Sequence, residues 1–475
     1  MKKYSIWLDD LDLSPTKKLD QDLKLDVLII GGGITGLNIA YQMKNKNLNI
    51  ALVEKNKIGS GITARTTGKL TFLQDDIYSF LEKNYSFNTA KMYLKSQKEA
   101  INMAKKIIDD NKIDCDLTNT YSYLLSNKKK NLEKEKDILK RLNIKVENDT
   151  LLNKFAIKVS NTAVFNPIKY LNALKEIIIR NNIDIYEQSC VTNIIKEDDY
   201  YICNINNKKV RTKKVVLACH YPFFLIPYFF PLKTSIEKSY VSASKINKTK
   251  NINAITLDKP IKSIRYYKDY FIYLTQPHNI SFKNNEEKNF KKVQEDLNKY
   301  KIEAEYIWSN HDIITFDRLP FIGEIKKNIY IATGYNTWGM TNGILSGKII
   351  SDLILNNYSE YSNLFDPNRN KITLKLINYP LNILYNSKSF VLNKIKKDKS
   401  WYSNLEFKKI DGKNVAIYTD INNKKHVVYN NCPHLGCTLL FNEVEKTWDC
   451  PCHASRFDVD GNNICGPSKK DIKYK

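Results

Sequence analysis

The sequence predicts an α/β nucleotide-binding domain in its first part and a small β-rich domain with metal ligands at its C-terminal end. Three observations predict this. A buried strand runs into a glycine-rich turn and a helix near residue 30. A second strand then ends on an acidic residue, an order that is typical of α/β nucleotide-binding units. Two closely spaced Cys–His pairs follow residue 430, a pattern that is typical of metal sites.

The nucleotide site is predicted by the apolar strand Asp26–Ile30 and the turn Gly31-Gly32-Gly33-Ile34-Thr35-Gly36 that follows it. Gly31 permits the tight turn, Gly33 lets the backbone approach a pyrophosphate, and Gly36 lets the helix pack on the strand. The helix N-terminus would bind the phosphates. A glycine-rich turn in an ordinary α/β unit is the alternative.

The next strand, Asn49–Val53, favours the nucleotide interpretation because it ends on Glu54, 18 residues beyond Gly36. An acid at this place accepts hydrogen bonds from ribose hydroxyls. The flanking strands, the helix and the acid together therefore predict a dinucleotide site.

The C-terminal pairs have the pattern Cys432-x-His434, fifteen residues, Cys450-x-x-His453. Zinc takes two Cys and two His in a tetrahedral site. A Rieske [2Fe–2S] centre also takes two of each, with the Cys on one iron and the His on the other. The alternation of Cys and His favours the cluster, because each iron then receives one residue from each loop.

The sequence from about residue 400 to 475 resembles the Rieske family. Beyond the ligand pairs, the resemblance is carried by Asn442, Trp448-Asp449, Arg456-Phe457-Asp458, Gly461 and Gly466-Pro467. It implies that Cys432 and Cys450 hold one iron and that His434 and His453 hold the other. Cys437 and Cys452 stand at matching places beside these ligands, where a disulfide could tie the two loops together.

The same resemblance bears on the cluster potential. Ser455 occupies the position whose hydroxyl bonds a cluster sulfur in the family, Phe457 stands where high-potential members carry Tyr, and Ala454 replaces the usual Gly. We expect a potential in the lower part of the range of about −150 to +300 mV.

Residues from about 20 to 360 resemble FAD-dependent oxidoreductases of the D-amino-acid oxidase and glycine oxidase type. Five stretches carry this resemblance: the glycine turn, Ser60–Lys69, Val215–Cys219, Asp317–Gly334 and Trp338–Thr341. It implies a Rossmann-like α/β FAD-binding domain with an antiparallel-sheet substrate domain, followed by an all-β Rieske domain. The expected FAD-binding residues are Gly31, Gly33, Ile34, Thr35, Gly36, Glu54, Lys55, Ser60, Thr63, Ala64, Thr66, Thr67, Ala218, Gly334, Trp338, Gly339, Met340 and Thr341.

The expected division of the chain follows from the two resemblances and from composition. Residues 1–24 are an N-terminal extension, 25–365 the FAD-dependent oxidoreductase, 366–399 an Asn- and Lys-rich linker, and 400–475 the Rieske domain. Within the oxidoreductase, the FAD-binding parts are about 25–75, 155–235 and 310–360, and the substrate parts are about 76–154 and 236–309. The stretch 78–145 is expected to be helical and polar, with a solvated helix over 128–140. Strands are expected over 241–244, 263–267 and 270–274.

Arg265 is the best candidate for binding a substrate carboxylate, because a guanidinium offers two parallel donors. A structural arginine is an equal alternative. Tyr267 and Lys69 are the other candidate catalytic residues, and Tyr273 and His278 are weaker ones. Thr275–His278 stands where family members often carry glycines, so the substrate class stays open.

The function expected from both resemblances is an FAD-dependent oxidation of a C–N bond in an amine or amino acid, with a Rieske cluster as electron outlet. The alternative is an electron-transfer protein that receives electrons from a partner. A ring-hydroxylating oxygenase would need a further mononuclear iron site with two His, and His220, His278, His311 and His426 are too dispersed for one. An NAD(P)H reductase would need a second dinucleotide motif.

The net charge of +24 could attract nucleic acid or an acidic electron carrier. The lysines are spread along the chain without a nucleic-acid motif, so we expect no nucleic-acid partner and leave an acceptor protein open. The most apolar run, Phe223–Leu232, is too short to span a membrane. The start, Met1–Lys24, is polar, and a cytoplasmic location is expected.

Overall fold

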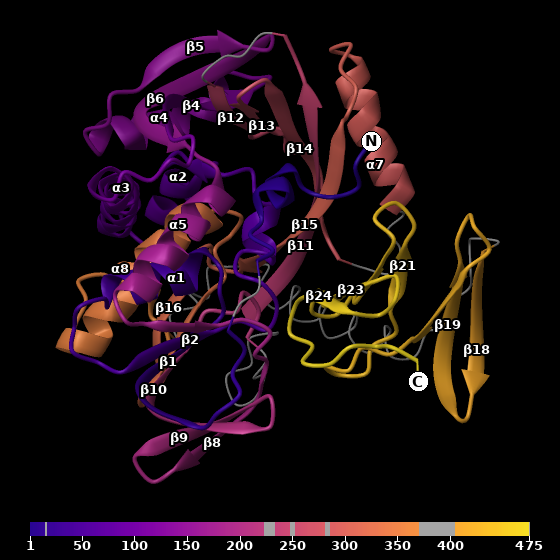
Figure 1. The fold of residues 1–475 in the computed structure, drawn as a ribbon. Coiled ribbons are helices and arrows are strands. Elements are labelled where there is room, and N and C mark those ends of the chain that lie inside the picture. The colour runs from indigo at the N-terminus through magenta and orange to yellow at the C-terminus, as the bar shows by residue number, and fades with distance from the viewer. Residues whose placement is uncertain (15–16, 223–232, 248–251, 281–285, 370–403, 475) are drawn as a thin grey trace.

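The computed structural model describes residues 1–14, 17–222, 233–247, 252–280, 286–369 and 404–474 (Figure 1). Two large sheets form the body of the molecule, and the C-terminal domain lies beside the second of them. The predicted linker is described only up to residue 369, and the apolar run Phe223–Leu232 lies outside the described residues.

Among the described residues, eight strands form the first sheet, with a central path of six. In the order of that path they are β16 (Phe321–Lys326), β17 (Ile329–Thr333), β10 (Lys208–Leu217), β1 (Leu23–Ile30), β2 (Ile50–Val53) and β7 (Asp184–Tyr186). β9 (Tyr200–Ile205) pairs with β10, and β8 (Val191–Glu197) pairs with β9. Val27 and Ile29 of β1 face one hydrophobic core, and Leu28 and Ile30 face the other. Burial on both faces explains the uninterrupted apolar run in the sequence.

Nine strands form the second sheet in the described part of the chain. They are β15 (Tyr306–Thr315), β11 (Thr234–Lys245), β14 (Tyr270–Asn279), β13 (Ser263–Tyr267), β12 (Ile252–Thr256), β4 (Thr118–Ser126), β6 (Lys154–Val164), β3 (Lys69–Leu70) and β5 (Glu147–Leu151). The predicted strands over 241–244, 263–267 and 270–274 are confirmed within β11, β13 and β14.

The expectation of a helical stretch over 78–145 is wrong for β4, which lies between two helices. Its inward positions include Thr120, Ser122 and Leu124. Inward and outward positions alternate with a period of two, as in any strand. The sequence did not reveal this, because two of the inward positions carry polar Thr and Ser instead of apolar residues.

Most of the described helices lie on one side of the two sheets, and α7 (Glu286–Asn298) packs against β11 and β14 on the other side (Figure 1). The others are α1 (Ile34–Gln42), α2 (Ile77–Asn84), α3 (Phe87–Asp110), α4 (Lys130–Arg141), α5 (Pro167–Arg180), α8 (Gly339–Asn356) and α9 (Ser362–Phe365), with 3₁₀ turns at Ile6–Asp10 and Ile62–Arg65. No described helix combines the length and apolar character that a bilayer crossing needs.

The N-terminal extension is packed into the body of the molecule. Trp7 is fully buried, and its indole N–H donates to the Thr66 carbonyl over 2.6 Å. Lys2 forms a β-bridge with Tyr306 of β15. The first residues therefore help to fix the segment that follows Glu54.

The C-terminal domain consists of two small antiparallel sheets. One contains β18 (Leu405–Ile410), β19 (Lys413–Thr419) and β20 (Lys425–Tyr429), and the other contains β21 (Leu440–Asn442), β22 (Thr447–Asp449), β23 (Arg456–Asp458) and β24 (Asn463–Cys465). Trp448 and Phe457 are fully buried in its core. The ligand loops lie between β20 and β21 and between β22 and β23.

Gly36 gives a direct test of the contact between α1 and β1. A Cβ at this position would lie 1.9 Å from the Gly31 carbonyl oxygen, which is backbone and cannot move aside. We expect Gly36→Ala to lower the free energy of unfolding by about 1–3 kcal/mol or more and to reduce flavin content in the purified protein. Thermal denaturation and flavin release measure the two effects.

Gly61→Ala is the matched control, because nothing lies within 4 Å of a Cβ at Gly61 and its φ is −78°. Equal stability losses for the two variants would contradict the assigned contact.

Candidate functional site

A cavity of about 1110 Å³ lies where the two large sheets and the C-terminal domain meet. We refer to it as the central cavity. Its walls include Gly31–Thr35 and Glu54 from the first sheet and Trp338–Met340 from the start of α8. Residues 464–469 of the C-terminal domain complete the wall. Motifs from both ends of the sequence therefore meet at one site.

The glycine turn has the form that a dinucleotide requires. Gly31 has a φ of +116°, and a Cβ there would lie 2.5 Å from the Ala218 carbonyl oxygen. The Glu54 carboxylate accepts hydrogen bonds from the backbone N–H groups of Gly32 (2.8 Å) and Asn56 (2.9 Å). Backbone and acid are thus held together, so the residues present fit the phosphate and ribose parts of such a ligand.

The start of α8 forms the part of the cavity wall that completes this predicted binding site. Trp338 caps the helix without a side-chain hydrogen bond, and Gly339 and Met340 line the cavity. Helix N-termini favour negative charge, so this end suits a ring that takes up electrons.

Most residues expected to bind FAD line the cavity. They are Gly31, Gly33, Ile34, Thr35, Glu54, Lys55, Ser60, Thr63, Thr66, Thr67, Ala218, Trp338, Gly339 and Met340. Four others lie behind the wall: Gly36, Ala64, Gly334 and Thr341. Gly36 and Gly334 instead allow close packing, since a Cβ at Gly334 would lie 2.5 Å from Thr315 Cγ2.

Arg265 does not line the cavity, so its position does not support the expected role as a carboxylate-binding residue. Its guanidinium is fully buried and donates from Nη1 to the carbonyls of Thr67 (2.6 Å) and Gly68 (2.8 Å). Arg265 therefore shapes the Thr67–Gly68 loop from behind. These contacts favour the alternative that Arg265 is a structural arginine.

Tyr267 also lies outside the cavity wall, because its hydroxyl donates to Asp116 over 2.8 Å and accepts from Asn166 over 2.9 Å. The weaker candidates are engaged elsewhere too. Tyr273 donates to Asp296 over 2.6 Å, and His278 stacks on Tyr240 with ring centroids 5.6 Å apart. Side-chain type alone could not show which of these residues face the cavity.

Lys69 is the predicted catalytic residue that lines the cavity. It is 6% exposed, and its ammonium donates to the Ser263 hydroxyl (2.6 Å) and the Ala254 carbonyl (2.8 Å). Burial, with a smaller contribution from the charge of Arg265, lowers the pKa of Lys69 to about 7. It can therefore gain or lose a proton near neutral pH.

Four further carboxylates line the cavity that were not expected as site residues: Asp75, Asp76, Glu237 and Asp312. Burial raises the pKa of Asp75 to about 6 and that of Glu237 and Asp312 to about 7. For Glu237 and Asp312, an acid within a β-rich run was the available signal, but the sequence does not show which face of the strand it occupies.

The two C-terminal loops bring the expected metal ligands together. Cys432 and Cys450 are both buried. The rings of His434 and His453 lie 5.0 Å apart between centroids, and neither nitrogen of His434 has a hydrogen-bond partner within the described residues. A Cys pair beside a His pair fits the donor set of a [2Fe–2S] centre with mixed ligands.

Cys437 and Cys452 are joined by a disulfide that links the two loops, as predicted. Their sulfurs and that of Cys450 lie within 4.8 Å of one another. The two disulfide sulfurs are already bonded, so they do not add ligands to the site. Ala454, at the place of the usual Gly, has a φ of +57°, a conformation that glycine favours.

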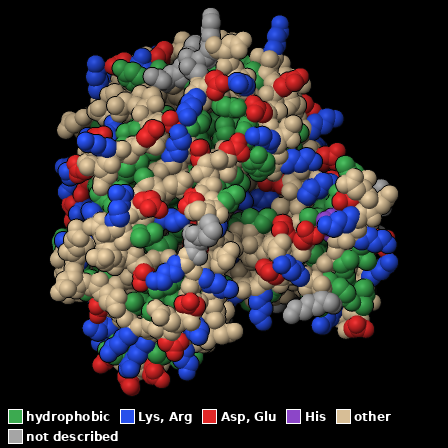
Figure 2. All heavy atoms as spheres, in the orientation of Figure 1, with side chains coloured by type: hydrophobic (Ala, Val, Ile, Leu, Met, Phe, Trp, Pro, Cys, Tyr) green, Lys and Arg blue, Asp and Glu red, His purple; other side chains and the backbone are tan. Residues whose placement is uncertain are grey.

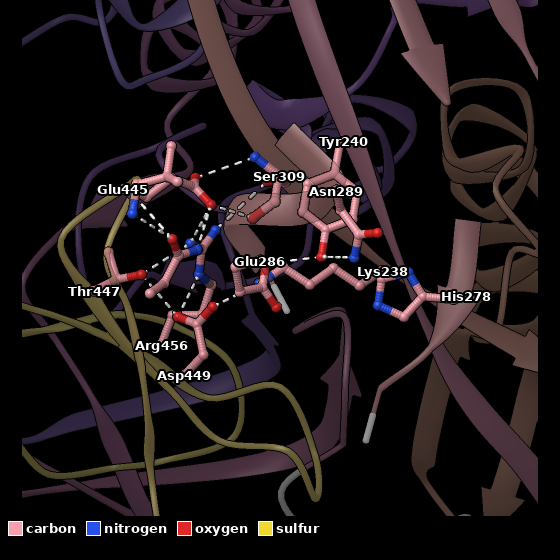
Figure 3. A network of polar contacts seen from close by, with 12 residues as sticks. Lys238, Tyr240, His278, Glu286, Asn289, Ser309, Glu445, Thr447, Asp449 and Arg456 are labelled. Atoms are coloured by element: carbon pink, nitrogen blue, oxygen red, sulfur yellow. Dashed lines mark hydrogen bonds and ion pairs between the residues drawn. The ribbon is translucent and has the colours of Figure 1, made fainter. Parts of the chain in front are cut away.

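A buried charge network holds the C-terminal domain against β11 and β15 (Figure 3). Lys238 of β11 contacts Asp449 over 2.8 Å and Glu286 over 2.9 Å. Arg456 contacts Asp449 over 3.0 Å and Glu445 over 2.8 Å. Burial alone would lower the pKa of Lys238, but the two carboxylates raise it above its usual value. We refer to these five residues as the docking network.

Two further contacts connect the C-terminal domain to the central cavity. Lys55, directly after Glu54, donates to the Gly466 carbonyl and to Asn463, each over 2.7 Å. Tyr221 lines the cavity, and its ring centroid lies 5.3 Å from that of His453. The ligand loops are thus adjacent to the cavity wall.

Lys238→Met tests the docking network, because it would leave the buried carboxylate of Asp449 and the half-buried carboxylate of Glu286 without their shared cation. We expect a loss of about 3–5 kcal/mol, seen in calorimetry as earlier unfolding of the C-terminal domain. Faster hydrogen exchange over 445–449 would accompany it.

Lys245→Met is the control on the same strand. Its ion pair with Asp269 is exposed, at 67% and 49% of the two side chains, so a loss below about 1 kcal/mol is expected. Similar losses for the two variants would contradict a docking role for Lys238.

Lys and Arg side chains on the face shown in Figure 2 are interspersed with Asp and Glu. They do not gather into one stripe on that face, unlike the surface of a protein that binds a nucleic-acid backbone.

Comparisons with known proteins agree with this architecture. The family description "FAD dependent oxidoreductase" matches residues 26–353, and "Rieske [2Fe-2S] domain" matches residues 394–474. YhfW of Bacillus subtilis (strain 168), named as a Rieske 2Fe-2S iron-sulfur protein, is 30% identical over 98% of this chain and 96% of its own length.

More distant similarities cover the flavin part. Gamma-glutamylputrescine oxidoreductase of Escherichia coli (strain K12) is 21% identical over 72% of this chain and 86% of its own length. The crystal structure of glycine oxidase from Geobacillus kaustophilus shares the fold with a TM-score of 0.62, at 16% identity, over 73% of this chain and 99% of that one. The chain belongs to the FAD-dependent oxidoreductase family and carries a Rieske [2Fe–2S] domain at its C-terminal end, so its cofactors are FAD and a [2Fe–2S] cluster.

Proposed function

We propose that this protein is a dehydrogenase that oxidises a C–N bond of an amine or amino acid and passes the electrons to its Rieske cluster. The observation that carries the proposal is the central cavity, whose walls come from the FAD fingerprint, the second sheet and the Rieske domain. The name of the E. coli relative, a gamma-glutamylputrescine oxidoreductase, supports an amine substrate.

FAD supplies the hydride acceptor for a C–H bond next to nitrogen, and the cluster takes electrons singly. In this proposal Gly31–Thr35 hold the pyrophosphate and Glu54 the ribose. The first residues of α8 face the ring. Each of these groups lines the cavity.

Lys69 holds the proton that the substrate must lose in this proposal, because an amine donates hydride only when it is neutral. Its lowered pKa, to about 7, lets it accept a proton near neutral pH. The Ser263 hydroxyl at 2.6 Å and the Ala254 carbonyl at 2.8 Å keep the side chain in place.

Tyr221 connects the cavity with the cluster in this proposal, since it lines the one and contacts His453 beside the other. We assign Cys432 and Cys450 to one iron and His434 and His453 to the other. The low-range cluster potential expected from Ser455, Phe457 and Ala454 stays a prediction.

Cys450→Ser tests the ligand assignment. Mutating a residue that supports a metal ligand typically lowers metal affinity at least ~10-fold. Removing a ligand itself should lower it at least as much, so iron and acid-labile sulfide should fall at least ~10-fold. Cys465→Ser is the control, since Cys465 is buried in the same domain outside the assigned set and should leave iron content unchanged. Purified wild type with zinc in place of iron and sulfide would overturn the assignment.

Anaerobic mixing with a panel of amines and amino acids tests the reaction. We expect at least one of them to bleach the flavin and a reduced-cluster electron paramagnetic resonance signal to follow. tert-Butylamine is the control ligand, because the carbon bearing its nitrogen has no hydrogen to transfer. Bleaching by a reduced carrier protein, but by none of the amines or amino acids, would contradict the proposal and favour the electron-transfer alternative.

A further inference from the structure

Four polar side chains form a compact group on the cavity face of β11 and β15, which we call the polar block. In the antiparallel register Glu237 lies opposite Asp312, and Ser239 lies opposite Asn310. All four line the central cavity. Residues two apart on a strand share a face, so the block is a continuous surface of two residues by two.

The neighbouring positions on the same strands face the other way. Lys238 and His311 are paired between Glu237 and Ser239 on one strand and Asn310 and Asp312 on the other. Lys238 belongs to the docking network and is 2% exposed. Lys238 therefore forms its ion pairs on the face toward the Rieske domain. The face toward the cavity carries the two carboxylates of Glu237 and Asp312.

The block also presents oxygen atoms that lack partners in the described structure. Ser239 is 4% exposed and Asn310 is 5% exposed, and neither Ser239 Oγ nor Asn310 Oδ1 has a hydrogen-bond partner. The Asn310 amide nitrogen already donates to Asp312 over 2.9 Å, so the amide oxygen is the atom that is available to accept a hydrogen bond. Buried polar atoms without partners are costly. The Asn310 oxygen needs a ligand that donates a hydrogen bond, and the Ser239 hydroxyl can accept one from the same ligand.

The charges around the block are also those of a cation site. Burial raises the pKa of Asp312 and Glu237 to about 7, with further repulsion from Glu237 on Asp312 and from Asp75 on Glu237. Among the cations that line the cavity wall, Lys69 donates to Ser263 and Ala254, and Arg318 is paired with Asp76 over 2.7 Å. Lys259 is exposed, and its charge partly offsets the rise in the pKa of Glu237.

We propose that the polar block binds an alkylammonium group of the substrate in the protonated form in which it arrives, before the reacting amine loses its proton, which makes the substrate an amine recognised by its positive charge. The inference rests on the proposed function and names its substrate class. An ammonium offers three donors, which match two carboxylates and two unpartnered oxygens. Neither an anionic phosphate nor a substrate carboxylate suits this surface, and Arg265, the expected carboxylate partner, lies behind the wall.

The test measures binding without turnover, using the FAD-loaded full chain. Three probes share a tert-butyl group: tert-butylammonium, tert-butanol and pivalate. We expect calorimetric titration to show that tert-butylammonium binds at least ~10-fold more tightly than the neutral or the anionic probe. Tighter binding of pivalate would overturn the inference.

Glu237→Gln and Asp312→Asn remove the charges while keeping the shapes. Each should weaken tert-butylammonium binding ~10-fold, and together ~100-fold, with flavin content and melting temperature unchanged. Glu197→Gln, at an exposed position on β8, is the control and should bind as wild type does. Equal ammonium affinity in the double variant and wild type would refute the subsite.

The two proposals can fail separately. Ammonium binding that depends on Glu237 and Asp312, without flavin bleaching by any amine, would keep the subsite and remove the dehydrogenase. Bleaching by amino acids, with pivalate as the preferred probe, would keep the dehydrogenase and remove the subsite.

Discussion

The alternation of side chains across β11 and β15 is the constraint on which the arrangement of this protein depends. Because successive residues of a strand point to opposite faces, Glu237 and Ser239 face the cavity while Lys238 and Tyr240 face away from it. One pair of strands thus forms a wall of the central cavity and a docking surface. A shift of one residue in register would exchange the two surfaces.

The docking network shows why the Rieske domain occupies one defined position. Burying Lys238 and Arg456 is costly unless their carboxylate partners are in place, so a displaced domain would leave charges buried and unpaired. Such a network contributes more to orientation than to net stability. It keeps His453 beside Tyr221, with ring centroids 5.3 Å apart.

The sequence predicted the local parts of this architecture well, because glycine turns, ligand pairs and apolar strands are written in consecutive residues. The fingerprint from Gly31 to Glu54 and the Cys437–Cys452 disulfide are found as expected. Properties that depend on which face a strand turns to the interior were not predictable. Arg265 and Glu237 lie on strands of one sheet, yet Arg265 faces a backbone loop and Glu237 faces the cavity. No pattern of residue types distinguishes these two environments, because each is set by distant segments.

The contact of Lys55 with Gly466 and Asn463 has a thermodynamic consequence. Since both domains supply walls to one cavity, any molecule that fills it touches both and favours their association. By thermodynamic linkage the effect is reciprocal: association of the Rieske domain raises the affinity of the cavity for that molecule by the same factor. Retention of the flavin and cohesion of the two domains are therefore a single equilibrium property of this chain.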